Sequence, residues 1–222
     1  MTRRLLPGPG GALLVTAVLV LSGCGGGGSS NPGAGSSGPT GTTSSATQGG
    51  SSPTSQASSV QGVALTAQGT ELRLGQSARV SWQPDQKKVG VLKLAVTKLQ
   101  RVSIGVFRDW RLDRATRRST PYFVHAEVKN LGRSDLSQVP VPLYLLDRRN
   151  TLLQASTFRA RFAACPSRPL PDHFTHRAKA TVCLVYFAPQ HGKLAAISFR
   201  PTQDFDAITW HGPLSKPSKK KH

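Results

Sequence analysis

Apolar and polar residues alternate along several segments in the last two thirds of the chain, and this alternation predicts β-strands. Leu92, Leu94 and Val96 share one face of such a segment, and its opposite face carries Lys93 and Thr97. A period of two residues is typical of a strand that buries one face. Strand patterns, either alternating or as short apolar runs, are present at residues 70–74, 78–82, 91–99, 122–129, 142–146, 151–153, 182–187 and 194–199.

Turn residues separate these segments at regular intervals. Polar or glycine-containing turns are expected at residues 130–132, 147–150 and 189–192. Residues 182–187 are apolar on both faces, which predicts a central strand. No segment shows the sustained 3.6-residue apolar spacing of a helix. Seven or so short strands joined by turns predict an all-β, antiparallel β-sandwich.

The first apolar run of the chain has a different character. Residues 12–21 form a ten-residue apolar stretch, broken only by Thr16, that follows Arg3 and Arg4. A membrane-spanning helix needs about 20 residues, so this stretch is predicted to be the core of a signal peptide. It leads directly into Leu21-Ser22-Gly23-Cys24. This tetrapeptide resembles the lipobox of bacterial lipoproteins.

The lipobox resemblance implies a cleaved lipoprotein signal peptide (residues 1–23) and a lipid on Cys24, with palmitate among its acyl chains. A chain with two or more acyl groups is stably anchored. We therefore expect a lipid-anchored protein at the extracytoplasmic face of the cell membrane, which contacts the membrane through the lipid on Cys24. The alternative is an ordinary secretory signal with a chance cysteine. The general secretory route is favoured, although Arg3 and Arg4 also permit twin-arginine export.

Composition divides the rest of the chain. Residues 25–61 are rich in Gly, Ser, Thr and Pro and carry no charge. Such a segment buries too little apolar surface to offset the entropy of ordering. Residues 24–61 are therefore predicted to be a lipidated cysteine followed by a disordered linker. The folded domain is expected at residues 62–212, and a basic disordered tail at residues 213–222.

A set of short segments occurs in a distinctive order within the expected domain. They are Leu74-Gly75-Gln76-Ser77-Ala78, Thr120-Pro121-Tyr122-Phe123-Val124, Val128-Lys129-Asn130-Leu131-Gly132, Cys165 with Leu170-Pro171-Asp172-His173-Phe174, Val182-Cys183-Leu184-Val185-Tyr186, and Ile208-Thr209-Trp210. This order resembles the immunoglobulin-like extracellular domain of secreted and lipid-anchored proteins of high-GC Gram-positive bacteria, a class that includes secreted immunoprotective antigens.

The resemblance covers roughly residues 70–210. It implies an antiparallel immunoglobulin-like β-sandwich with a disulfide bond and no established catalytic residues. One departure is His176-Arg177-Ala178, where a Pro-Gly turn is usual in the family. The conformation of this turn is therefore left open.

The three cysteines fit an exported protein. If Cys24 carries a lipid, Cys165 and Cys183 remain, and both lie in the expected domain. Two cysteines in an oxidising compartment favour a disulfide bond. The alternative is two free buried thiols.

The chain is strongly basic, with a formal net charge of +19. Such a surface attracts polyanions. Outside the cell the expected partners are anionic envelope polymers, lipid headgroups or acidic proteins. No nucleic acid is expected because of the lipobox, and the protein is expected to be a monomer.

One basic loop between predicted strands is the candidate ligand site. Its members are Arg108, Trp110, Arg111, Arg114, Arg117 and Arg118. Arginine interleaved with aromatic residues binds anions and stacks on rings. The alternative is a surface loop whose Trp110 folds back onto the sandwich.

Motifs of known enzyme classes are absent from the expected domain: it has no Gly-x-Ser-x-Gly, His-Glu-x-x-His, P-loop or Cys-x-x-Cys. Asp172, His173 and His176 are candidate metal ligands, but a solvated loop is the favoured interpretation. We therefore expect neither a metal nor another cofactor, and a non-catalytic binding or interaction module. The alternative is an envelope enzyme whose site is formed only in space.

Overall fold

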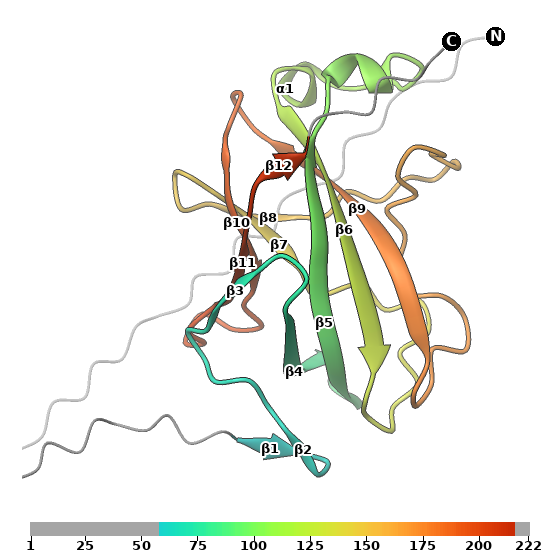
Figure 1. Cartoon of the computed structure of the whole chain (residues 1–222). Coiled ribbons are helices and arrows are strands. Elements are labelled where there is room, and N and C mark those ends of the chain that lie inside the picture. The colour runs from blue at the N-terminus through green and yellow to red at the C-terminus, as the bar shows by residue number, and fades with distance from the viewer. Residues whose placement is uncertain (1–57, 216–222) are drawn as a thin grey trace, which may run out of the picture. The chain divides into compact units, whose positions relative to one another are not determined.

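The computed structural model describes residues 58–215, which form an all-β sandwich of two five-stranded sheets together with a two-stranded hairpin (Figure 1). The all-β sandwich with mainly antiparallel pairing that the sequence predicts is confirmed. The predicted signal peptide, Cys24 and most of the predicted linker lie outside the described residues, as do residues 216–222.

The strands are β1 (Ser59–Val60), β2 (Val63–Ala64), β3 (Glu71–Arg73), β4 (Ser77–Asp85), β5 (Lys88–Arg101), β6 (Thr120–Asn130), β7 (Tyr144–Asp147), β8 (Leu152–Gln154), β9 (Lys179–Ala188), β10 (Leu194–Phe199), β11 (Ile208–His211) and β12 (Leu214–Ser215). The 3-10 helix η1 (Ile104–Phe107) and the short helix α1 (Arg114–Arg117) lie between β5 and β6. One sheet has the order β3-β11-β10-β7-β8. In the other, β9 pairs with β6 and β6 with β5, while β4 and β12 share the remaining edge of β5.

Two of the crossings between the sheets, from β3 to β4 and from β11 to β12, lie next to parallel pairs at the sheet edges. β3 pairs in parallel with β11, and β12 pairs in parallel with β5. Gly75 makes the first crossing with a positive φ of 86° and donates its N–H to the Val96 carbonyl at 2.8 Å. A side chain at Gly212, on the second crossing, would overlap Leu74. The two crossings therefore pack against each other and need a glycine each.

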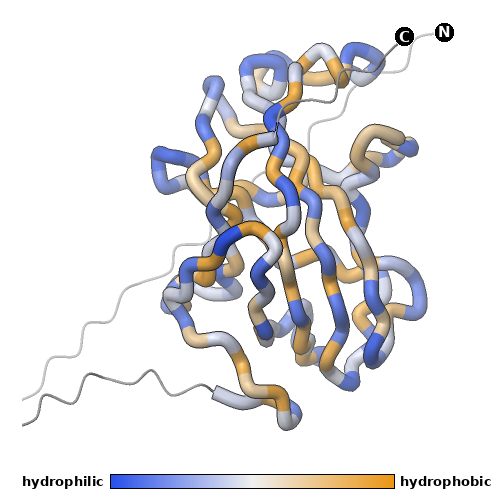
Figure 2. The backbone as a smooth tube through the Cα atoms, in the orientation of Figure 1, coloured by the Kyte–Doolittle hydropathy of each residue, from blue (hydrophilic) through white to orange (hydrophobic). Residues whose placement is uncertain are grey.

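The core lies between the two sheets, where the predicted alternation places apolar side chains. Leu92, Leu94 and Val96 of β5 are fully buried, and Trp210 of β11 is buried in the same cluster. Figure 2 shows the alternation as orange and blue segments along the long strands. The β5–β6 register shifts between Val96 and Lys98, and this bulge turns Leu99 inward as well.

Two buried tyrosines tie loops to the core. The Tyr186 hydroxyl donates to the Leu143 carbonyl at 2.7 Å, and the Tyr122 hydroxyl donates to the Gly192 carbonyl at 3.2 Å. Burial raises the pKa of Tyr186, so this phenol stays protonated as a donor. In the described part of the chain, every buried side-chain nitrogen and oxygen has a hydrogen-bond partner.

Three sequence expectations need correction. β9 contains the run expected to form a central strand, but it lies at the edge of its sheet. It is apolar on both faces because its outer face packs into a second cluster that includes Val185. Residues 59–61, within the predicted linker, belong to the β1–β2 hairpin. Residues 214–215, within the predicted tail, form β12, which pairs with β5.

The turn at residues 176–178, whose conformation the sequence leaves open, is defined by the structure. Arg177 adopts a φ of 68°, donates its N–H to the Asn130 carbonyl at 2.9 Å, and lies before β9. A left-handed residue is thus required here, and arginine occupies the position that glycine fills most easily.

Candidate functional site

A second apolar cluster, called the outer cluster below, lies on the face of the β5–β6–β9 sheet that points away from the core. Its buried members are Val102, Phe107, Phe123, Phe162, Cys165 and Val185, with Ile104, Trp110, Leu112, Phe158, Cys183 and Phe187 packed against them. The ring centroids of Phe107 and Phe162 are 4.9 Å apart, as are those of Trp110 and Phe158. These contacts hold two long loops, residues 103–118 and 155–167, against the sheet and against each other.

A disulfide bond fixes the second of these loops. Cys165 is joined to Cys183 of β9, with a Cα–Cα distance of 5.2 Å, so the predicted pairing is confirmed. Ser167 adds a clamp: its N–H donates to the Cys183 carbonyl at 2.9 Å, and its hydroxyl accepts the Val185 N–H at 2.9 Å. The loop is therefore pinned along the free edge of β9.

The first loop, residues 103–118, is called the arginine segment below, and capping residues give it a defined shape. Ser103 caps η1 by accepting the Gly105 N–H at 3.2 Å. Asp113 caps α1 by accepting the N–H of Thr116 at 2.8 Å and its hydroxyl at 2.9 Å. The backbone bond from Thr116, followed by its hydroxyl, lowers the pKa of Asp113.

Trp110 lies in the outer cluster, so the alternative reading of that residue is correct: it folds back onto the sandwich. The five arginines of the predicted ligand loop are exposed. Arg108, Arg111 and Arg117 border a surface hollow of about 540 Å³ whose wall includes Trp110 and Phe107. Arg114 and Arg118 do not line it.

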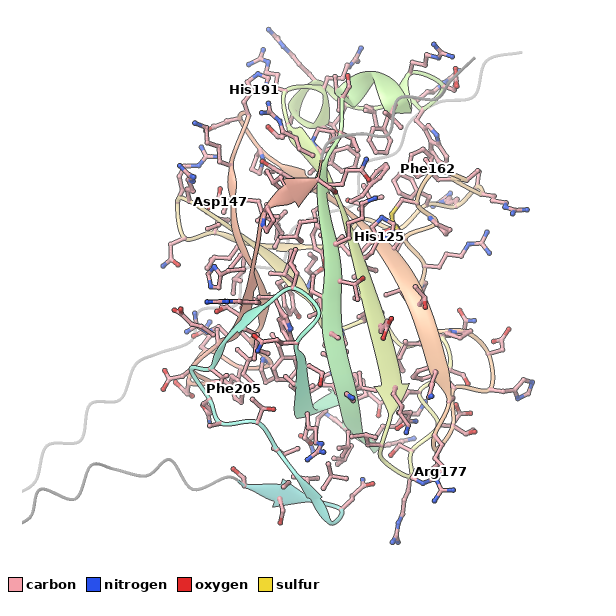
Figure 3. The ribbon with its side chains drawn as sticks, in the orientation of Figure 1. His125, Asp147, Phe162, Arg177, His191 and Phe205 are labelled. Atoms are coloured by element: carbon pink, nitrogen blue, oxygen red, sulfur yellow. A yellow bond between two sulfur atoms is a disulfide. The ribbon has the colours of Figure 1, made fainter. Side chains whose placement is uncertain are left out.

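The fold adds basic residues from distant parts of the chain to this end of the sandwich. The Arg118 carbonyl accepts the His191 N–H at 2.8 Å, which places the β9–β10 turn beside α1 (Figure 3). The Arg148 N–H donates to the Lys193 carbonyl at 2.9 Å, which places the β7–β8 turn beside that turn. Arg159 and Arg161, both exposed, lie between Phe158 and Phe162 on the disulfide-bound loop.

Sequence reasoning missed these additional residues. We call the whole group the basic end, and its members are Arg108, Arg111, Arg114, Arg117, Arg118, Arg148, Arg149, Arg159, Arg161, His191 and Lys193. Antiparallel strands return their turns to the same edge of a sheet. The predicted turns at 147–150 and 189–192 therefore indicate that Arg148, Arg149, His191 and Lys193 lie at one end of the sandwich. No pattern indicates the neighbourhood of Arg159 and Arg161, which depends on aromatic packing.

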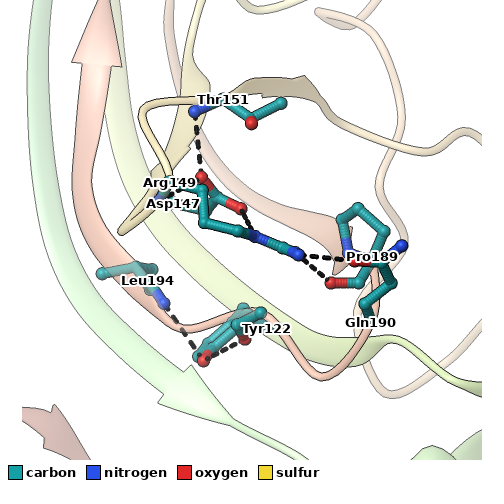
Figure 4. Close-up of polar contacts among 8 residues, drawn as sticks. Tyr122, Asp147, Arg149, Thr151, Pro189, Gln190 and Leu194 are labelled. Atoms are coloured by element: carbon teal, nitrogen blue, oxygen red, sulfur yellow. Dashed lines mark hydrogen bonds and ion pairs between the residues drawn. The ribbon is translucent and has the colours of Figure 1, made fainter.

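Asp147 organises the β7–β8 turn (Figure 4). Its buried carboxylate accepts the N–H groups of Arg149 and Thr151, each at 2.9 Å, and pairs with the Arg149 side chain at 3.3 Å. Burial acts to raise the pKa of Asp147, but the hydrogen bonds from Thr151 and Arg149 and the charge of Arg149 outweigh it, so the pKa is lowered. Arg149 is thereby aimed at the Pro189 carbonyl, at 2.6 Å, and at the Gln190 side chain, at 2.7 Å.

Few cations of this surface are neutralised within the chain. Among residues 58–215, salt bridges are made only by Arg149 with Asp147 and by Arg108 with Asp109, the latter at 3.9 Å and largely exposed to solvent. An exposed pair of this kind contributes little stability. Most arginines of the basic end therefore keep their charge available to an external anion.

The candidate metal ligands do not converge. The His176 ring bonds to the Gly132 carbonyl at 2.9 Å, and the Asp172 carboxylate accepts from Gln138 at 2.9 Å. Within residues 58–215 there is no group of three or more His, Cys, Asp or Glu side chains placed to hold a metal ion. The same residues contain no helix with the length and apolar character to cross a membrane.

Comparisons with family models, with curated proteins and with solved structures find no match to this chain. The resemblances stated from the sequence therefore stay predictions.

Proposed function

We propose that this chain is a lipoprotein anchored through Cys24 at the extracytoplasmic face of the cell membrane, and that its sandwich is a non-catalytic module that binds anionic partners of the cell envelope. Such partners are envelope polymers, lipid headgroups or acidic proteins. The observation that carries the proposal is the basic end, where exposed and mostly unpaired arginines stand on a framework of stacked rings and a disulfide bond.

The framework matters because a binding surface gains affinity when its loops are ordered before the partner arrives. Caps at Ser103 and Asp113 order the arginine segment. The disulfide and Ser167 order the neighbouring loop. Arginine carries a planar fork of donors that suits carboxylate, phosphate and sulfate groups.

Binding of the mature chain (residues 24–222, Cys24→Ser) to vesicles containing phosphatidylglycerol and to heparin tests the proposal. Every core residue lies within residues 72–210, so this chain keeps the whole sandwich. The variant Arg108→Gln/Arg111→Gln/Arg117→Gln removes the arginines of the hollow. At about 1 kcal/mol for each basic residue near an anionic surface, it should bind about 100-fold more weakly.

The matched control is Arg133→Gln/Arg168→Gln/Arg200→Gln, which removes the same charge from exposed positions elsewhere. It should weaken binding only slightly, and salt should weaken binding of the unmodified chain steeply. Equal losses in both triple variants would show that net charge alone causes binding. No binding to either probe at low salt would overturn the proposal.

Anchoring is tested in a bacterial host that makes lipoproteins. The full chain should incorporate labelled palmitate and sediment with membranes, and Cys24→Ser should abolish the label. Labelling that survives Cys24→Ser would refute lipidation at this residue.

A further inference from the structure

A row of basic side chains crosses the outer face of the β5–β6–β9 sheet, away from the basic end. Lys93 of β5 is the direct neighbour of Lys129 of β6, and Lys129 is the direct neighbour of Lys179 of β9. On the other side, Arg79 of β4 is paired with Lys93. Four basic residues thus occupy one line across four adjacent strands, which we call the lysine row.

All members of the lysine row point away from the core, because their neighbours in sequence point into it. Ala78, Val80, Leu94 and Val128 are buried between the sheets. Along β6, Lys129 is six residues from Phe123 of the outer cluster, which corresponds to about 20 Å of strand. The row therefore lies on open sheet surface beyond the two loops that cover the outer cluster.

The row places like charges directly opposite each other on neighbouring strands. Like charges placed directly opposite each other on neighbouring strands repel. The nearest acid in the register is Glu127, on the next rung between Ala95 and Thr181. Within residues 58–215, neither Glu127 nor any other acid forms a salt bridge with the row. A bound anion would supply the missing counter-charge.

The surface beside the row indicates which class of anion fits there. Lys93, Lys129 and Lys179 border a shallow hollow of about 470 Å³, together with Ala95, Glu127, Val128, Ala180 and Thr181. This lining has no aromatic side chain on which a nucleobase could stack. It does offer a carboxylate and a hydroxyl, which suit the hydroxyl groups of a sugar. The floor is formed by small side chains, so an extended chain fits across it.

We propose that the lysine row binds a linear anionic polysaccharide that runs across the strands. Adjacent strands are about 4.8 Å apart, and a pyranose residue in an extended chain has about this length, so successive sugars meet successive basic residues. Carboxylate or sulfate groups pair with the ammonium groups, and the sugar hydroxyls face Glu127 and Thr181. This deepens the proposed function, since it assigns a ligand class to a module proposed to bind envelope anions, but it uses a different surface from the basic end.

The test compares the mature chain with Lys93→Gln/Lys129→Gln/Lys179→Gln in titrations with short oligosaccharides of polygalacturonate (carboxylate) and of heparin (sulfate). The control variant, Lys87→Gln/Lys88→Gln/Arg200→Gln, removes the same charge from exposed or half-exposed positions that belong neither to the row nor to the basic end. Loss of three surface charge pairs should weaken binding about tenfold or more in the row variant, and clearly less in the control. The oligosaccharide whose binding the row variant weakens more identifies carboxylate or sulfate as the preferred group. Equal losses in the two variants would overturn the lysine row as a site.

Two further readouts separate this inference from the proposed function. If the row variant binds normally while the arginine variant of the basic end does not, the lysine row fails and the proposed function stands. If oligothymidylate of equal charge binds the row as tightly as the oligosaccharides, the assignment to a polysaccharide is wrong. If neither vesicles, heparin nor oligosaccharides bind, both proposals fall.

The unfolding temperature gives a readout that does not depend on binding. Lys129→Gln removes the central charge of the row and should raise the unfolding temperature at low salt, with the gain shrinking as salt is added. Polygalacturonate should stabilise the unmodified chain more than this variant. A variant less stable than the parent at low salt would contradict the repulsion on which the inference rests.

Discussion

Arg177 adopts the backbone conformation that its turn requires, although this conformation is strained. Its backbone lies in the left-handed region, with a φ of 68°, where a side chain other than glycine is strained by about 1–2 kcal/mol. The residue sits just before β9, at the end of the sandwich opposite His191 (Figure 3). The sequence shows that this turn contains no Pro-Gly pair, but only the structure shows that Arg177 adopts a left-handed conformation.

Replacing Arg177 with glycine should therefore stabilise the fold. Relief of the strain exceeds the extra entropy of glycine in the unfolded chain, and a gain of about 0.5–1 kcal/mol is expected. Urea unfolding measures it. Arg200→Gly, at a residue without a positive φ, serves as the control and should give no gain. A destabilised Arg177→Gly would contradict this account of the turn.

Asp147 is a second residue whose role is local. Asp147→Ala leaves two turn N–H groups and Arg149 without their acceptor, so we expect a loss of about 1–2 kcal/mol in urea unfolding. The exposed Asp204→Ala should change little.

Because the folded pKa of Asp147 is lowered, its contribution to stability is present above the unfolded pKa of about 3.9 and is lost as the pH falls through the folded pKa. An acid limb of the stability curve unchanged in Asp147→Asn would argue against this linkage.

His125 provides a test at milder pH. Burial, followed by the charge of Lys98, lowers its pKa, and its ring lies 3.8 Å from the Cys183 sulfur. The unfolded chain therefore takes up the proton more readily, so stability is full above about pH 6.5 and falls as the pH drops through the folded pKa. Thermal unfolding is measured from about pH 8 to about pH 5, on both sides of the ordinary histidine pKa. It should show this loss of stability in the parent and less of it in His125→Gln. A parallel pH dependence in the two chains would exclude His125 as the cause.

At the scale of elements, the outer cluster connects the disulfide to the basic end. Cys165 and Cys183 hold the 155–167 loop on β9, and Phe158 and Phe162 of that loop pack on the arginine segment. The alternation along β5 and β6 could be read from the sequence because its period is local. The outer cluster could not, since its aromatic contacts join two loops that lie far apart in the sequence and share no local pattern.

Removal of the disulfide tests this connection. Cys165→Ala/Cys183→Ala opens a covalent link across 18 residues and should cost about 3 kcal/mol. Limited trypsin digestion should then cut faster at Arg159 and Arg161, while cutting at the exposed Arg133 stays near the parent rate. Uniformly faster cutting at all three sites would show general unfolding instead of release of one loop.

For the whole molecule, the sequence predicts the sandwich and the disulfide bond. It also predicts that the first third of the chain forms no folded core. These predictions are possible because composition and period are properties of short windows. It predicts a strand at residues 70–74, where β3 lies, but not the parallel pairing of β3 with β11, and it does not predict β12, which is too short to carry a pattern. It also locates only one part of the basic end. The remainder depends on turns that the sheets bring together (Figure 1) and on a loop that aromatic contacts hold in place.

The central claim is that anions bind at the basic end and are not merely attracted by net charge. Side-chain Nε–Hε signals of arginine, followed by ¹⁵N NMR during titration of the mature chain with a heparin oligosaccharide, test it most directly. The account predicts that the signals of Arg108, Arg111 and Arg117 shift in a saturable way, while those of Arg133, Arg168 and Arg200 stay in place. Shifts of equal size in both groups, or none in either, would contradict it.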